Sequence, residues 1–447
     1  MENIFNFSKN AYQNLKQEYN NHPSLLFVLL ALLCIPLGYA FNSISLALLI
    51  IITLFNFKKE HLHFNYYLIF PIALYVLMLL SFTWSIDKDR TITAIYKELP
   101  LLLFPICFLL FRTFSESEKQ KITKGFSYGM VAFSFVYLIK ATIRFFVSQD
   151  TSVFFYHELV TKDVNAIHVS VYMAVSFFHF LVKPIKTRFD KLALAILFLM
   201  VFLLSSKNIV VVFIGLLGFY YLFFSKTAKK LRLRNLILFL VVLTSLPFIG
   251  KVKERFKQEY ETIMTDSSVN DVISKGSGKV YNVSIKQAWT NETFNPNDFF
   301  PGTAFRVYQF RIFTELLYEE AIFWKGFGLD ASCSKIEEKG VQYHLFLGDE
   351  NNEGYQKMNF HNQYIQVFAE LGIVGFILLL LMLALTIRNA FASKNYFHIA
   401  FSVLMISLFI TESFLWRQRG VTFFIVMYCV LNIKVKSEKQ FPFNTIL

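Results

Sequence analysis

The chain has 447 residues, of which 55% are hydrophobic and 18% aromatic, and its mean hydropathy is +0.47. A single soluble core does not grow to absorb that much apolar surface. The apolar residues also come in long runs rather than in amphipathic stripes, which is typical of membrane helices. The composition therefore excludes a large soluble helical protein and predicts an all-α polytopic membrane protein.

The net charge of +13 is distributed in a way that argues against a nucleic-acid partner. Residues 251–360 hold 13 Lys/Arg and 16 Asp/Glu, so the largest polar segment is slightly acidic. The positive excess lies in short loops between apolar runs, as the positive-inside rule describes. The sequence has no basic stripe interleaved with aromatic residues of the kind that a nucleic-acid groove needs. We therefore expect membrane lipids, and no nucleic acid, as partners.

The apolar runs predict twelve membrane spans, several of them shorter than the roughly 20 residues that cross a bilayer comfortably. We interpret the first run, which begins near Ser24, as an uncleaved membrane helix and not a signal peptide. The predicted spans are 24–41, 43–57, 64–84, 98–111, 126–147, 166–182, 191–205, 208–224, 234–250, 362–387, 396–414 and 420–433.

These spans divide the chain into three parts: residues 1–250 with the first nine spans, residues 251–360 as a large loop domain with short helices, and residues 361–447 with the last three spans. With the N-terminus inside, the inner segments carry most of the loop lysines and arginines, and the short outer loops carry few. This asymmetry places residues 251–360 on the outer face.

The four cysteines do not form a pattern that binds metal or builds a disulfide framework. Cys34, Cys107 and Cys429 lie in apolar runs, and Cys333 stands alone in the polar segment. Since the sequence has neither a CxxC pair nor a His/Cys cluster, we expect no zinc site and no metal-dependent chemistry.

His361 opens the tenth predicted span, directly after the polar segment. In the first turn of a helix, the positive end of the helix dipole disfavours the imidazolium ion and leaves a neutral ring that can accept a proton. His361 shares a helical face with Ile365, Phe368, Gly372 and Gly375, and the small residues allow neighbouring helices to approach closely. A general base is therefore one interpretation; a histidine satisfied at the membrane interface is the other.

The sequence predicts a helix over residues 304–324, followed by Gly326-Phe-Gly328. A glycine just past a helix is a common cap. Arg306 shares a face of this helix with Phe310, Phe313 and Leu317. An arginine on an apolar face points toward the membrane domain and needs an anionic partner or carbonyl groups there.

Arg311 lies on the far side of the same helix, four residues before Glu315. A surface ion pair between the two explains Arg311 without a role in binding. We therefore favour a functional role for Arg306 and a structural role for Arg311.

The string His361-Asn-x-x-Ile-x-x-Phe-x-Glu-x-Gly-x-x-Gly375, preceded by Arg306 and the Gly326-Phe-Gly328 turn, resembles the O-antigen ligase and polymerase superfamily. The likeness extends over most of the chain. Three further segments are similar to outer loops of that family: Leu80–Ser85, Ser205-Ser206-Lys207 with lysine in place of the usual arginine, and Thr411-Glu412-Ser413 followed by Arg417-Gln-Arg419-Gly420.

The resemblance implies a glycosyltransferase of the bacterial inner membrane with its active site facing the periplasm. Such an enzyme moves a glycan from undecaprenyl pyrophosphate to a hydroxyl of lipid A–core, with inversion and without a cofactor. It implies that His361 is the catalytic base and that Arg306 and Lys207 bind the pyrophosphate. Asn362, Arg311 and Arg419 are supporting candidates, and we expect a monomer.

The alternatives are a polymerase of the same superfamily, a protein O-oligosaccharyltransferase, and a transporter or flippase. A transporter predicts ionisable residues at mid-membrane, whereas this chain gathers its unusual charges at the outer boundary. The Asp87-Lys-Asp89 string could hold a metal, but a solvated turn is the favoured interpretation. Glu412, Arg417 and Arg419 are expected to form one ion-paired outer turn.

Overall fold

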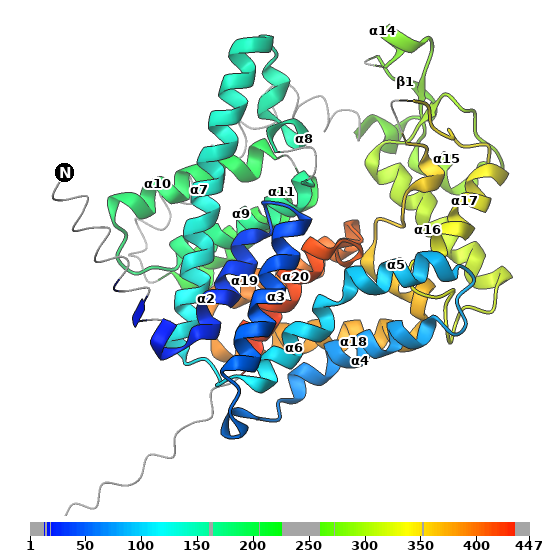
Figure 1. Ribbon diagram of the computed structural model, residues 1–447. Coiled ribbons are helices and arrows are strands. Elements are labelled where there is room, and N and C mark those ends of the chain that lie inside the picture. The colour runs from blue at the N-terminus through cyan, green and yellow to red at the C-terminus, as the bar shows by residue number, and fades with distance from the viewer. Residues whose placement is uncertain are drawn as a thin grey trace, which may run out of the picture.

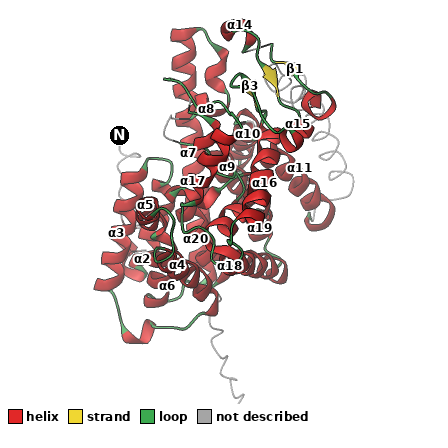
Figure 2. Cartoon of the chain, turned by 90° about the vertical axis from the view of Figure 1, so that its right-hand side faces the viewer, coloured by secondary structure: helices red, strands yellow, loops and turns green. Residues whose placement is uncertain are grey.

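The computed structural model describes residues 19–160, 164–204, 206–225, 260–271, 273–350 and 353–433, together with Gln13, Lys16 and Gln17. Helices dominate these residues, which confirms the all-α expectation apart from three two-residue strands (Figures 1 and 2). In chain order the helices are α2 (Pro23–Cys34), α3 (Tyr39–Phe55), α4 (Ile69–Ser81), α5 (Lys88–Glu98), α6 (Pro100–Leu110), α7 (Glu116–Ser148), α8 (Tyr156–Leu159), α9 (Ala166–Leu181), α10 (Arg188–Leu203), α11 (Lys207–Phe219), α14 (Ser274–Ser277), α15 (Ile285–Thr290), α16 (Gly302–Glu319), α17 (Ser332–Gln342), α18 (Gln363–Ser393), α19 (Tyr396–Thr411) and α20 (Gln418–Asn432).

Eleven of the twelve predicted spans coincide with helices in the described part of the chain; the ninth, 234–250, lies outside the described residues. By length and apolar composition, four helical segments there are able to cross a membrane: Lys88–Leu110, Glu116–Ser148, Lys207–Phe224 and Gln363–Ser393. The other apolar helices are shorter. For example, the 12 residues of α2 rise only about 18 Å.

The break between the first two helices differs from the prediction, which placed it at residue 42. The helical backbone stops at Cys34 and resumes at Tyr39, after Gly38 with a φ of 146°. Hydropathy alone could not locate this break, because apolar residues continue across it.

The predicted continuous span 362–387 is wrong in one respect, because α18 is broken at Gly372 (φ 66°, ψ −164°). The loop before α17 satisfies backbone groups around the break. Phe327 and Gly328 donate their N–H groups to the carbonyls of Ala369 and Glu370 at 2.8 and 2.9 Å, and Ile373 donates to Phe323 at 2.8 Å. Such a break is tolerated in a membrane protein when other parts of the chain pair the freed backbone groups.

Gly326 and Gly328 are therefore not caps of the predicted helix 304–324. The observed α16 ends at Glu319, and its C-cap residue Glu320 is extended. Both glycines have positive φ angles of 67° and 101°. A Cβ on Gly326 would lie 2.5 Å from the backbone nitrogen of Leu371, so the glycine is needed for close packing on α18.

The chain segment from Val283 to Phe360 builds a lobe beside the helical bundle, with its own hydrophobic core around Tyr308, Ile312 and Phe360 (Figure 1). This core continues into the first piece of α18 through Ile365 and Ala369. The rest of α18 packs in the bundle core through residues such as Leu379 and Met382. The broken helix thus connects the two cores.

A small three-stranded sheet lies beside the helices of the lobe (Figure 2). Its strand order is β1 (Ser268–Val269), β2 (Tyr281–Asn282) and β3 (Asp298–Phe299). β1 and β2 are antiparallel, with Ser268 opposite Asn282, and β2 and β3 are parallel, with Asn282 opposite Phe299. The strand β3 leads directly to the start of α16, which carries Arg306.

Candidate functional site

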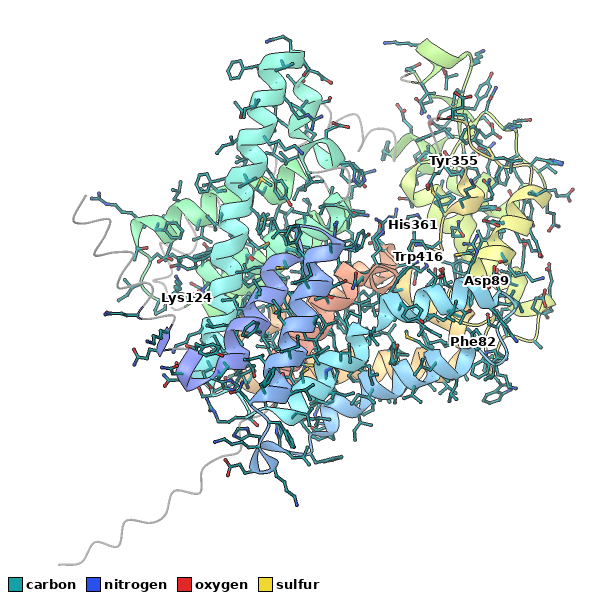
Figure 3. The ribbon with its side chains drawn as sticks, viewed as in Figure 1. Phe82, Asp89, Lys124, Tyr355, His361 and Trp416 are labelled. Carbon is teal, nitrogen blue, oxygen red and sulfur yellow. The ribbon has the colours of Figure 1, made fainter. Side chains whose placement is uncertain are left out.

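A cavity of about 690 Å³ lies where the lobe meets the bundle. The lobe contributes residues from the start of α16, Tyr355 and His361, and the bundle contributes the start of α11 and the end of α19. Figure 3 shows His361 on the side of the lobe that faces the bundle, with Tyr355 above it. Three of the residues predicted from the sequence, His361, Arg306 and Lys207, line this one cavity.

His361 does not lie in the first turn of a helix, which corrects the prediction. It precedes α18, whose N-cap is Asn362, and its own backbone is left-handed with a φ of 47°. The Asn362 side chain accepts hydrogen bonds from the N–H groups of Tyr364 and Ile365 at 3.0 and 3.1 Å. Asn362 therefore fixes the start of α18 and with it the place of His361.

The side chain of Asn359 helps to hold the left-handed backbone of His361. Its N–H donates to Oδ1 of Asn359 at 2.9 Å, and the edge of its ring meets Phe305 at 5.7 Å between centroids. A left-handed backbone at a residue with a Cβ is costly and is kept only where the surroundings determine it.

The imidazole of His361 faces a carboxylate. Its Nδ1 lies 3.7 Å from Oε2 of Glu412, within ion-pair range. Nδ1 itself is buried, whereas the side chain as a whole is 28% exposed, so the other edge of the ring is presented to the cavity. A carboxylate at Nδ1 favours the tautomer with the proton on that atom and leaves Nε2 as the acceptor.

Arg306 reaches the same carboxylate from α16. Its Nη2 lies 3.6 Å from Oε1 of Glu412, Nε donates to the carbonyl of Thr411 at 2.9 Å, and Nη1 donates to the carbonyl of Gly302 at 2.9 Å. The guanidinium thus points toward the bundle and meets both an anion and carbonyls. Phe310, expected on the same buried face, is instead 47% exposed and stacks on Trp289.

Glu412 is the site residue that sequence reasoning missed. It was expected in an ion-paired turn with Arg417 and Arg419, but the structure pairs it with His361 and Arg306. Burial acts to raise the pKa of Glu412, and the adjacent imidazole and guanidinium outweigh it, so the pKa lies below its usual value. Two cations expected at one cavity are the signal that could have pointed to a shared carboxylate.

Lys207 is the first residue of α11 and lines the cavity next to Ser206 and Asn208. The side chain of Asn208 donates to the carbonyl of Ser407 at 2.7 Å and to the hydroxyl of Thr411 at 2.8 Å. These bonds hold the start of α11 against the end of α19, so Lys207 and Glu412 border the same space. Ser205, the first residue of the predicted turn, lies outside the described residues.

Arg311 is not part of the cavity. Its Nε donates to Glu315 at 2.8 Å, as the spacing predicts, and Nη2 donates to the hydroxyl of Tyr343 at 2.9 Å. Burial acts to raise the pKa of Glu315, and hydrogen bonds from Tyr343, Lys339 and Arg311 outweigh it, so this pKa is also below its usual value. Arg311 therefore stabilises the interior of the lobe.

Arg419 and Asp87 likewise have structural partners. The guanidinium of Arg419 lies over the ring of Tyr39, 4.3 Å from its centroid, which ties α20 to α3. Asp87 caps α5 by accepting from the N–H of Arg90 at 3.1 Å, and Ser334 donates to it at 2.9 Å. Among the described residues, no group of three or more His, Cys, Asp or Glu side chains is arranged to hold a metal ion.

The remaining wall of the cavity is aromatic. Phe299, Phe300 and Phe305 line it from the lobe together with Tyr355, and Tyr156 lines it from the bundle side. Apolar walls with a few convergent charged groups are typical of sites for organic ligands. Aromatic faces also suit the C–H faces of sugar rings.

A protein-family model described as O-Antigen ligase matches residues 192–380. The matched segment includes Lys207, Arg306 and His361 and ends before Glu412. No curated protein sequence matches the chain. The match over residues 192–380 supports membership of the O-antigen ligase superfamily.

Proposed function

We propose that this protein is a ligase-type glycosyltransferase that moves a glycan from undecaprenyl pyrophosphate to a hydroxyl of lipid A–core. The observation that supports this most is the convergence of His361 and Arg306, from two different elements, on Glu412 in one cavity. A proton acceptor and a cation that share one space are what displacement of a pyrophosphate by a hydroxyl requires.

In the proposed reaction, the acceptor oxygen forms a bond to the anomeric carbon while the bond from that carbon to the pyrophosphate oxygen breaks. A single displacement of this kind inverts the anomeric centre. The charge that develops on the pyrophosphate is met by Arg306 and Lys207. Arg306 has five N–H donors, and its hydrogen bonds to the carbonyls of Thr411 and Gly302 leave donors on both terminal nitrogens for phosphate oxygens.

His361 takes the proton of the acceptor hydroxyl on Nε2. The positive charge that this creates on the ring is stabilised by Glu412, whose carboxylate lies 3.7 Å from Nδ1. The low pKa of Glu412 keeps it ionised, so the carboxylate does not compete for the proton. Arg306 and His361 thus share one counter-ion, which couples the group that binds the leaving group to the group that activates the acceptor.

The proposal places the cavity on the periplasmic side of the inner membrane. The sequence predicts that the lysine-rich segments face the inside of the cell. These lysines lie at the end of α18 and the start of α19, away from the cavity. A lipid carrier would then lie along the bundle with its pyrophosphate at the boundary between the bundle and the lobe.

The test uses the full-length protein in lipid nanodiscs with an undecaprenyl-pyrophosphate-linked glycan and lipid A–core. His361→Asn keeps a residue that tolerates the left-handed backbone and removes the base. We expect glycan transfer to fall by about 100-fold or more. The matched control is His344→Asn, at an exposed histidine of the lobe with a similar φ of 56°, which we expect to transfer at the normal rate.

The product separates this proposal from its nearest rival. A ligase attaches the glycan to lipid A–core, whereas a polymerase extends one carrier-linked repeat with another. Extension of the carrier-linked glycan with lipid A–core left unmodified would overturn the ligase proposal. Equal transfer by His361→Asn and His344→Asn would remove the role of His361.

A further inference from the structure

A second, larger cavity of about 860 Å³ lies at the opposite end of the bundle. α18 begins beside the candidate site and ends at this cavity, and α19 runs back from it to Thr411. The 16 residues of α19 separate the two cavities by about 24 Å along the helix axis. Figure 3 shows Lys124 on the other side of the molecule from His361.

Four lysines line this cavity: Lys119, Lys121, Lys124 and Lys183. We call it the basic basin. Glu116 is the one carboxylate among its lining residues. Lys119 donates to Glu116 and to the carbonyl of Ile433, both at 2.6 Å, and Lys183 pairs with Asp190 at 2.6 Å. Lysines still outnumber carboxylates, so the basin has a positive potential.

A buried histidine in the basin wall needs a partner. His398 is 2% exposed, and its Nε2 has no hydrogen-bond partner among the described residues. His179 also lines the basin, and its Nε2 likewise has no hydrogen-bond partner among the described residues. Buried polar nitrogen atoms are almost always paired in folded proteins, so these two histidines are side chains of the basin wall that a polar ligand could pair.

The start of α19 adds a third attractive element. His398 belongs to the first turn of this helix, whose N-cap is Asn395, and both line the basin. The Asn395 side chain accepts a hydrogen bond from the N–H of His398 at 3.3 Å, and the positive end of the helix dipole at this turn favours phosphate groups. Neither His398 nor the start of α19 takes part in the proposed transfer reaction at the other end of the bundle.

We propose that the basic basin binds a phosphate group. The ligand is either the phosphodiester of an anionic membrane lipid or free inorganic phosphate. Lys121 and Lys124 supply ammonium groups from α7, and His398 supplies an imidazole N–H. The volume of the basin exceeds what a single ion fills, so a lipid headgroup has room to enter from the bilayer. The proposal is independent of the transfer reaction.

The test compares two variants with the same change of charge. Lys121→Gln combined with Lys124→Gln removes two exposed lysines of the basin. The control combines Arg188→Gln with Lys191→Gln, which removes two exposed cations from the neighbouring helix α10, outside the basin. Because these residues are exposed, both variants are expected to fold.

Each protein is titrated with inorganic phosphate in phosphatidylcholine nanodiscs by calorimetry. In a second arm, each is extracted from vesicles of phosphatidylcholine with phosphatidylglycerol, and the lipid that stays bound is identified by native mass spectrometry. We expect binding to weaken about tenfold in the basin variant and to stay unchanged in the control. Selective retention of phosphatidylglycerol identifies a lipid headgroup, and saturable binding of inorganic phosphate alone identifies a free anion. If the basin variant matches the control in both arms, the proposal is wrong.

Discussion

Gln366 accepts a hydrogen bond from the hydroxyl of Ser413, with 3.3 Å between the oxygen atoms. The same amide oxygen accepts from the backbone N–H of Phe360 at 3.2 Å. Phe360 precedes His361, and Ser413 follows Glu412, so one buried side chain holds the two chain segments that carry the histidine and the carboxylate. At its other end, the amide nitrogen of Gln366 donates to Ser332 at 3.1 Å and to Glu370.

Replacing Gln366 with methionine should slow transfer more than it weakens substrate binding. The change keeps the volume but removes the acceptor for Phe360 and Ser413, so the segments are free to shift relative to each other. A displacement of about 1 Å in a catalytic group costs roughly 100-fold in rate. We expect kcat to fall by about that factor with a smaller change in KM, measured with the reconstituted enzyme.

The control for this variant is Thr386→Val, on the same helix but beyond the break at Gly372. Thr386 is also buried and accepts a hydrogen bond from Asn432 at 3.2 Å. Each change should lower the free energy of unfolding by about 1–3 kcal/mol, because each leaves a buried donor unpaired. Equal kcat values in the two variants would show that Gln366 is structural only.

Hydropathy and helical periodicity were sufficient to predict most helices and the direction of Arg306. Both signals are local: long apolar runs mark membrane helices, and residues three and four apart share a face. The position of His361 after the polar segment and the helical face of Arg306 singled out these two residues, and the family resemblance added Lys207; the structure brings all three to one cavity. Their roles in transfer remain predictions.

The residues that the sequence did not reveal depend on contacts between distant segments. Glu412 faces a histidine that precedes α18 and an arginine from α16, and nothing within its own turn indicates either partner. The break at Gly372 is stabilised by the loop Phe323–Gly328, which lies far from it in sequence. Backbone pairing of this kind leaves no periodic pattern in the sequence.

Arg306 and Arg311 lie on one helix and give opposite predictions for the same substitution. Arg306→Lys keeps the charge but loses the planar fork that binds a phosphate through two hydrogen bonds. We expect kcat/KM for the carrier-linked donor to fall by about 100-fold. The loss of thermal stability should be smaller than in Arg311→Lys, because the side chain of Arg306 is 32% exposed against 12% for Arg311 and water can replace its hydrogen bonds. Transfer rates at varied donor concentration test this.

Arg311→Lys should instead lower the melting temperature and leave kcat/KM near normal. It removes hydrogen bonds to Tyr343 and to the carbonyl of Asn291 inside the lobe, at a cost of about 2 kcal/mol. A loss of transfer in Arg311→Lys as large as that in Arg306→Lys, at a temperature where both are folded, would contradict this division of roles.

Glu412→Gln should reduce transfer about 100-fold or more, because a neutral amide cannot stabilise the imidazolium of His361. It should also destabilise the protein at neutral pH. The folded-state pKa of Glu412 lies below the ordinary value of 4.5, so its stabilising contribution is complete above 4.5 and is lost as the pH falls through the lower value.

The difference in melting temperature between Glu412→Gln and the unmodified protein should therefore be largest at neutral pH and shrink as the pH falls below 4.5. Thermal unfolding followed by tryptophan fluorescence across this range measures it. A difference that stays constant with pH would mean that the charge of Glu412 does not contribute to stability.

The fold requires a glycine at position 372 but can accept a side chain at position 215. Gly372 adopts a φ of 66° at the break in α18, and a Cβ there would lie 2.7 Å from the backbone nitrogen of Lys325. Gly215 lies within α11, and a Cβ there would meet no atom within 4 Å.

Gly372→Ala should cost about 3 kcal/mol or more, since both the backbone angle and the packing oppose it. Gly215→Ala should stabilise the helix by up to about 1 kcal/mol. Melting temperatures that move in the same direction in both variants would show that the contact between the loop Phe323–Gly328 and α18 does not depend on a glycine at the break.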